Sequence, residues 1–216
     1  MINGFLLPFI IIIIKRRRLH VTEKFYLLQV NDALFPIGAY SHSQGLETYI
    51  QNGIVHDEKT AEEYIKNKIK WNFATTELLS VKLAYESAEA ERLEELEELE
   101  EILEASRIPM EQRDAVRKMG SRFVKTIEKL DLEINETGIY KEYVTARKGK
   151  NISHSCVYGV FCSALGIELE EALEHYLYAQ TSAMVTNCVK TIPLSQSVGQ
   201  KLLSRCFFEF QEVLKH

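Results

Sequence analysis

The sequence predicts an all-α protein that folds as a single helical bundle of about eight helices. From Glu23 onward, apolar residues recur at three- and four-residue intervals, and no stretch of useful length alternates as a strand does. Residues that interrupt helices are sparse, with four prolines and ten glycines among 216 residues. Because 46% of the residues are hydrophobic, a chain of this length can bury one continuous core, and one domain is expected.

The first elements are predicted to be short. Apolar residues over 25–31 indicate a helix, and the segment 33–40 is expected to be a turn because it contains a proline and a glycine. The next helix is expected to begin at Ser41, where residues 41–44 (Ser-His-Ser-Gln) fit a capping box. It should end at Gly53, which suits a left-handed cap.

A long helix is predicted to follow. Thr60 and Glu63 repeat the capping pattern, and apolar residues continue at helical spacing over 64–84. The run Glu89 to Glu104 mixes glutamates with leucines and isoleucine, which predicts a solvated amphipathic helix with a narrow apolar stripe. The run lacks the glycine turn and the alternating oxygen ligands of a calcium loop, so a metal site is not expected there.

The second half of the chain is predicted to be helical with clear interruptions. Pro109 suits the first turn of a helix whose apolar face extends over 116–130, and residues 131–137 break that helix. A polar stretch then runs as far as Asn151. The remaining helices are predicted over 153–165, 168–191 and 197–214, with Gly166 and Pro193 closing the first two.

The first 22 residues are expected to be an extension that is disordered or not native, so that residues 23–216 form the domain. The run Phe5 to Ile14 is almost wholly apolar, but it is shorter than the roughly 20 residues that span a bilayer. Its basic residues follow it at 15–18, whereas a secretory signal places them before the apolar run. We therefore expect neither export nor membrane insertion, and predict a cytoplasmic protein.

Composition also excludes one class of partner and indicates how the cysteines are used. The formal charge of −5 argues against nucleic-acid binding, which needs a concentrated surplus of lysine and arginine. The four cysteines, Cys156, Cys162, Cys188 and Cys206, lie in apolar helical contexts without a CxxC pair. We interpret them as reduced core residues rather than as metal ligands.

No recognisable catalytic or metal-binding motif is present. The sequence has no GxxxxGK[ST] phosphate loop, no GxSxG, no HExxH, and no zinc-deaminase signature. Of the six histidines, only His42, His154 and His175 lie in the helical body, and they are widely dispersed. We therefore predict a protein that is not an enzyme and holds no permanent cofactor or metal.

Two segments have a composition that is unusual for a plain core. Residues 33–47 place Pro36, Gly38 and several polar residues in a turn and helix start, which fits either a structural turn or a functional surface. Residues 180–200 mix glutamines, threonines and a lysine with apolar neighbours. Because buried polar groups need partners, this second segment is either an internal polar network or a binding surface.

The same two segments carry a family resemblance. Residues 33–47, ALFPIGAYSHSQGLE, resemble the opening signature of UreF proteins, with its Pro-x-Gly, aromatic-Ser-His-Ser and Gly-Leu-Glu elements. A second block is similar to the family in order and spacing, and the resemblance extends from about Phe25 to Leu214. This block consists of His154, Val157-Tyr158-Gly159, Ala164-Leu165-Gly166, Tyr176-Leu177-Tyr178, Lys190, Ile192-Pro193-Leu194, Gln196 and Gly199-Gln200-Lys201-Leu202-Leu203.

The sequence departs from the family pattern at three places. Ser155 stands where the family commonly has proline, and Ser195 stands where it commonly has glycine; both are local changes in turns. The chain ends at His216, where family members usually continue into a tail that docks on the partner UreD, so that this tail is expected to be missing.

The resemblance implies an all-α urease accessory protein, a nickel-insertion chaperone that is commonly dimeric. It would form a complex with UreD (also called UreH) and the GTPase UreG, and the complex would act on apo-urease, with nickel at most in transit. The partner-binding residues that follow from the resemblance and from the two unusual segments are Pro36, Gly38, Tyr40, His42, Glu47, Tyr178, Lys190, Pro193, Gln196 and Gln200.

Two alternatives to this function remain. The first is a catalytic GTPase activator in which Arg107, Arg113 or Arg117 enters the UreG site as an arginine finger. The second is a generic helical scaffold unrelated to urease. Urease structural genes and a gene for a P-loop protein beside this one would decide between the scaffold and the accessory protein.

Overall fold

The protein is an all-α bundle, as the sequence predicts. The computed structural model describes residues 22–38, 45–106 and 110–215, and no strand occurs within these ranges. Its elements are a helix over 22–30, α2 (Leu46–Gln51), α3 (Glu58–Lys68), the π-helix η2 (Ile69–Leu78), α4 (Leu79–Glu89), α5 (Leu93–Ser106), α6 (Met110–Ile127), the 3₁₀-helix η3 (Glu133–Asn135), α7 (Gly138–Ala146), α8 (His154–Ala164), α9 (Leu169–Thr191), α10 (Gln196–Arg205) and α11 (Phe207–Val213).

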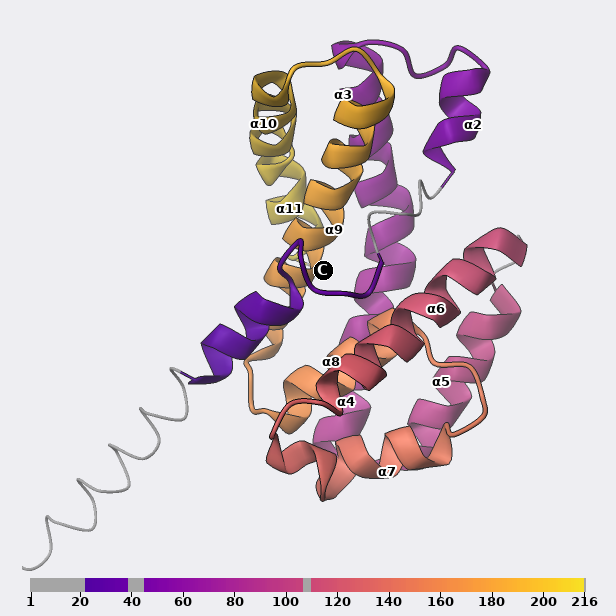
Figure 1. Ribbon diagram of the computed structural model, residues 1–216, viewed down its shortest axis with the longest axis vertical. Helices are drawn as coiled ribbons and strands as arrows, with labels where there is room; N and C mark the ends of the chain where they lie inside the picture. Colours follow the sequence, from indigo (N-terminus) through magenta and orange to yellow (C-terminus); the bar gives the residue numbers. More distant parts are fainter. Residues whose placement is uncertain (1–21, 39–44, 107–109, 216) are drawn as a thin grey trace, which may run out of the picture.

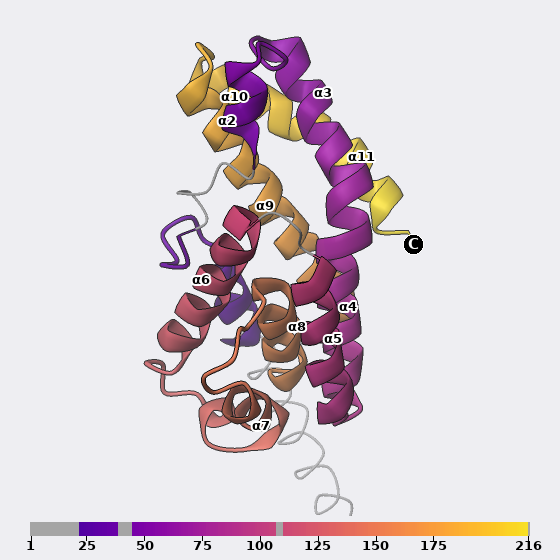
Figure 2. The ribbon, with the colours of Figure 1, turned by 90° about the vertical axis from the view of Figure 1, so that its right-hand side faces the viewer.

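One long helix organises the bundle. The elements α3, η2 and α4 follow one another without a break from Glu58 to Glu89 and extend along most of the molecule's longest axis (Figures 1 and 2). The helices α2, α9, α10 and α11 lie with its first half, and α5, α6, α7 and α8 lie with its second half. We call these the upper and the lower group. In the described residues, no helix is both long enough and apolar enough to cross a membrane.

The N-cap of the long helix lies three residues before the predicted one. Asp57 is the N-cap, its carboxylate accepts from the Thr60 backbone N–H at 2.8 Å, and the Thr60 hydroxyl accepts from the Asp57 N–H at 3.0 Å. Thr60 is therefore the third helical residue of a capping box rather than the cap, and the predicted pairing of Thr60 with Glu63 is wrong. A carboxylate in this position also complements the positive end of the helix dipole.

The lower group is built around α8. Almost all of this helix is buried, and its most extensive contact is with α4, while α6, α7 and α9 cover its other sides. Gly159 makes the approach to α4 possible, because a Cβ there would lie only 2.5 Å from the carbonyl oxygen of Val81. The crossing therefore needs a residue without a side chain at this point.

The upper group is held by apolar contacts and by ion pairs. α9 packs against α10, α3 and α2, and α11 packs against η2. The Arg205 guanidinium at the end of α10 reaches both Glu58 and Glu62 of α3, at 2.9 and 2.8 Å. Because these ion pairs are partly exposed, they contribute little to the stability of the fold, but they fix the orientation of α10 on α3.

Several predicted boundaries need correction. The second helix begins at Leu46 rather than at Ser41, because Gly45 has a φ of 93°, which no right-handed helix contains; the predicted capping box over 41–44 lies outside the described residues. The polar stretch before Asn151 contains α7, which the sequence analysis missed. The last predicted helix is divided at Cys206 into α10 and α11.

Candidate interaction surfaces

The turn over residues 31–38 is anchored on the lower group. The Phe35 ring packs against Phe123 of α6 at a centroid distance of 5.6 Å. The side-chain amide of Asn31 donates to the Tyr158 hydroxyl of α8 at 2.9 Å. The Arg122 guanidinium of α6 lies 3.5 Å from the Ile37 carbonyl oxygen. Side chains of α6 and α8 therefore hold the inner side of the turn in place.

The outer side of this turn forms a shallow apolar groove. Its volume is about 460 Å³, and Leu34 at its edge is 90% exposed. The predicted site residue Pro36 is exposed on the same wall. The residues that line the groove are Phe25, Leu28, Gln29, Asp32, Leu34, Phe35, Pro36 and Thr126. Open apolar surface of this kind is typical of contact with another protein.

The glycine at the end of the turn has a conformation that other residues avoid. Gly38 has a φ of 80°, in the left-handed region. We expect Gly38→Val to strain the turn by roughly 1–2 kcal/mol, because a β-branched side chain clashes with the backbone there. The melting temperature should therefore fall by roughly 2–8 °C, since about 1 kcal/mol shifts it by about 2–4 °C in a chain of this size. Gly38→Asn, which tolerates left-handed geometry better, is the control; equal loss in both variants would contradict this explanation.

The second predicted surface is the junction between α9 and α10. Pro193 is exposed directly after α9 ends, and the Ser195 hydroxyl caps α10 by accepting from the Val198 N–H at 3.2 Å. Lys190 in the last turn of α9 and the two glutamines, Gln196 and Gln200, are exposed as well. A lysine in this position also complements the negative end of the α9 dipole.

The polar block over 180–200 contains both buried and exposed polar residues. Gln180 and Thr181 are buried in the middle of α9, so the beginning of the block belongs to the interior. From Lys190 onward most of its polar side chains are exposed. The sequence left an internal network and a binding surface as alternatives, and the structure assigns the two halves of the block to different environments.

The predicted site residues do not form one surface. The turn over 31–38 lies near the middle of the molecule, whereas the junction of α9 and α10 lies at its upper end (Figure 1). Glu47 is exposed on α2, and Tyr178 is half-exposed on α9, with its ring 6.4 Å from that of Phe207. Tyr40 and His42 lie outside the described residues.

The histidine of the second block belongs to the core. His154 is only 4% exposed, and its ring stacks on Tyr176 at 5.6 Å and meets the edge of Phe123. Its Nδ1 lies 3.5 Å from the Tyr176 hydroxyl, which itself lies 3.4 Å from a Glu77 carboxylate oxygen. Burial lowers the pKa of His154 to about 4, so the ring is neutral near pH 7. The cysteines are buried too, and all four are free thiols, as predicted.

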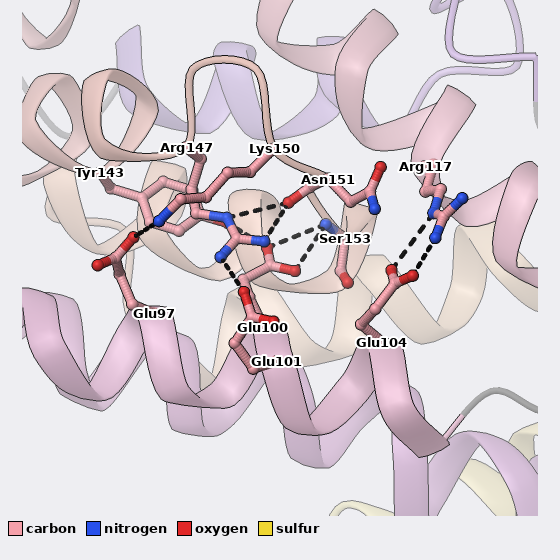
Figure 3. A network of polar contacts seen from close by, with 10 residues as sticks. All are labelled: Glu97, Glu100, Glu101, Glu104, Arg117, Tyr143, Arg147, Lys150, Asn151 and Ser153. Carbon is pink, nitrogen blue, oxygen red and sulfur yellow. Dashed lines mark hydrogen bonds and ion pairs between the residues drawn. The ribbon is translucent and has the colours of Figure 1, made fainter.

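A polar network that sequence reasoning missed joins α5 to the loop before α8 (Figure 3). Glu100 is 1% exposed, and both of its carboxylate oxygens accept from the Ser153 backbone N–H, at 2.9 and 3.0 Å. The Tyr143 hydroxyl donates to the same carboxylate. Burial and the charge of Glu100 raise the pKa of Tyr143 well above its ordinary value, so the phenol stays protonated and remains a donor.

The neighbouring glutamates of α5 extend this network. Arg147 is buried, donates twice to the Asn151 carbonyl oxygen and pairs with Glu101 at 2.8 Å. Lys150 pairs with Glu97, also at 2.8 Å (Figure 3). The helix α5, which was predicted to be solvated, is therefore only partly solvated. Several of its glutamates contact the chain between α7 and α8 and hold it in place.

Two of the three arginines that were candidates for an arginine finger lie within the described residues. Arg117 pairs with Glu104 of α5 (Figure 3) and also with Asp114 of its own helix, so its guanidinium is already engaged. Arg113 is partly buried, and Arg107 lies outside the described residues. Among the described residues, no three His, Cys, Asp or Glu side chains are placed to hold a metal ion together.

Comparison with protein-family models gives a match over most of the chain. Residues 55–207 match the model of the UreF family, which covers well over half of the chain. The matched region runs from the loop before α3 to the start of α11 and contains the junction of α9 and α10. It also contains the buried network of Glu100.

Proposed function

The chain belongs to the UreF family of urease accessory proteins, and from this premise we propose that it is a chaperone that assembles with UreD and the GTPase UreG on apo-urease. In this proposal the protein has no catalytic centre and binds nickel at most in transit, in the cytoplasm. The observation that supports it best is the family match over 55–207. We further propose that residues 23–54 belong to the same domain, since α2 packs on α9 and Phe35 packs on Phe123.

In this function the protein acts through its contact surfaces and not through a reactive site. The turn over 31–38 and the junction of α9 and α10 are both exposed and are both held by buried neighbours. Rigid surfaces lose little conformational entropy on binding, which suits a protein that positions others. We infer that the junction borders the contact with UreD and UreG, or the contact between two copies of this chain.

Two substitutions at the junction test its role in assembly. We expect Lys190→Glu and Gln196→Ala each to weaken the complex several-fold. The first reverses a charge at an interface rim and so repels a partner surface that had matched it, and the second removes a side chain that can hydrogen-bond to the partner. Helix content and melting temperature should stay nearly unchanged, since both side chains are exposed. The measurement is pull-down of the variants with co-expressed UreD and UreG.

A matched control separates a specific surface from general charge. Lys148→Glu makes the same change at an exposed lysine after α7, in the lower group, and should leave pull-down unaffected. Full recovery of the complex with both junction variants would reduce the junction to a structural connection. A large drop in their melting temperature would place it in the core instead.

The function as a whole is tested in cells. Deleting the gene should leave urease protein present but without activity, and the wild-type chain should restore the activity. Urease that is fully active in the deleted strain would refute the accessory role.

A further inference from the structure

The solvent-facing side of α6 carries a row of basic residues. Lys118, Arg122 and Lys125 are exposed and stand four and three residues apart, so they follow one another along one side of the helix. The exposed Lys129 continues the row in the turn directly after α6, where its N–H donates to the Thr126 carbonyl oxygen at 3.1 Å. We call these four basic residues the basic stripe. At about 1.5 Å per residue, the stripe extends over roughly 16 Å.

The charges of the stripe are not neutralised within the protein. In the part of the chain that the structure describes, no carboxylate pairs with Lys118, Lys125 or Lys129. Like charges three or four residues apart on a helix repel one another, as Arg122 does with the lysines on either side of it. The chain as a whole has a formal charge of −5, so an unopposed row of cations is a local feature of this helix. A partner that brings carboxylates would relieve the repulsion.

The basic stripe borders the apolar groove beside the turn over 31–38. Thr126 of α6 lines this groove, and it lies about one helical turn from both Arg122 and Lys129. The Arg122 guanidinium also reaches the turn itself, 3.5 Å from the Ile37 carbonyl oxygen. The turn and α6 lie side by side in Figure 2. The apolar groove and the basic stripe are therefore neighbouring parts of one surface.

The lining of the groove suits the side chains of a peptide better than lipid. Phe25 and Leu28 from the helix over 22–30 are 65% and 52% exposed, and Leu34 from the turn is 90% exposed. Asp32 lines the groove too, and its carboxylate accepts from the Leu34 N–H at 2.7 Å. Covering this carboxylate with hydrocarbon would cost free energy, because hydrocarbon offers no donor in place of water. A peptide can offer both apolar side chains and N–H or O–H donors.

We propose that the groove and the basic stripe together bind an acidic amphipathic helix of a partner protein. Its apolar side chains enter the groove, and its glutamates or aspartates pair with the stripe. A stripe of this length matches about three turns of such a helix. The inference deepens the proposed function by giving the turn over 31–38 a partner chemistry. It rests on that function only for the expectation that the chain acts through contact surfaces.

A synthetic helical peptide is the probe for this surface. It has about 18 residues, or five helical turns, with leucines along one side, glutamates beside them and a fluorophore at one end. Titration with the purified full chain should raise the fluorescence anisotropy to saturation in the micromolar range. The affinity should fall as salt is added, because salt screens exposed charges. The same peptide with lysine in place of glutamate, or with serine in place of leucine, should bind far more weakly.

Variants of the chain test the two parts of the surface separately. The double variant Lys118→Glu, Lys125→Glu should raise the dissociation constant of the glutamate peptide by roughly tenfold and should bind the lysine peptide more tightly than the wild type does. Leu34→Glu should raise the constant for the glutamate peptide to a similar degree, because it places a charge against apolar side chains. Lys141→Glu on α7 and Ile102→Glu on α5 make matching changes at exposed positions elsewhere and should leave binding unchanged.

Several outcomes would overturn the proposal. No binding of the glutamate peptide, or equal binding of the glutamate and lysine peptides, would remove the stripe as its partner. Unchanged affinity in Leu34→Glu would remove the groove. Binding to vesicles of phosphatidylserine and phosphatidylcholine in place of the peptide would make this a lipid surface. A doubled mass in light scattering that Leu34→Glu abolishes would assign the groove to a second copy. Urease activation in cells is measured separately, so failed peptide binding would not be confused with a failed accessory role.

Discussion

Replacing Glu100 with alanine should lower the free energy of unfolding by roughly 3–5 kcal/mol. The carboxylate is almost fully buried and accepts hydrogen bonds from the Ser153 N–H and the Tyr143 hydroxyl. Without it both donors stay buried and unpaired, and the loop that leads into α8 loses its attachment to α5. A change of this size is a large part of the stability of an ordinary domain. Urea or thermal unfolding followed by circular dichroism measures it.

The same helix offers a matched control. Glu97 pairs with Lys150, but both side chains are substantially exposed, so Glu97→Ala should change stability little. Glu100→Gln keeps the shape and one acceptor oxygen and should lie between the two. If Glu97→Ala and Glu100→Ala unfold at the same urea concentration, the buried network does not hold the loop as described.

Stability should also fall below pH 6.5 because of His154. In the folded protein the pKa of His154 is about 4, whereas a histidine in an unfolded chain has a pKa of about 6.5. Between these values the unfolded state binds a proton that the folded state does not, so stability rises with pH there. The contribution is complete above the unfolded pKa and is lost as the pH falls to about 4. It amounts to about 3 kcal/mol.

The variant His154→Phe isolates this effect. It removes the titrating group and keeps an aromatic ring beside Tyr176 and Phe123. Unfolding free energies measured from pH 4 to pH 7 should depend on pH less steeply in the variant than in the wild type. Parallel curves would show that His154 does not titrate with a depressed pKa.

The sequence predicted the helices that have strong local signals. Gly166 closes α8 with a φ of 69°, and Pro193 follows α9, so the boundaries of the two helices were correct within a residue or two. The helix α7 was missed because its apolar residues are mixed with charged ones. Tyr140 and Tyr143 make it a core element, and only their burial against other helices reveals this.

The candidate site was less predictable than the fold. Glu100 lies four residues after Leu96 and three before Leu103, both buried, so its spacing places it on the buried side of α5. What the run of glutamates does not show is that Tyr143 and Ser153, from a distant part of the chain, are its partners. The exposure of Trp71 is also not visible in the pattern, because aromatic residues usually lie inside. The junction residues Lys190 and Gln196 were found because a family resemblance pointed to them. Their role as a contact remains a prediction.

The π-helix η2 sets how far the second half of the long helix is rotated about its axis relative to the first half. A π-helix advances by a smaller angle per residue than an α-helix, so residues 69–78 decide which side α4 shows to α8 once α3 has met α9 and α10. In an α-helix each residue turns the chain by roughly 100°. Inserting or deleting one residue within η2 would therefore rotate one group of helices against the other by about a quarter of a turn. The number of residues in this segment is therefore constrained, because it fixes the rotation of the lower group of helices relative to the upper group.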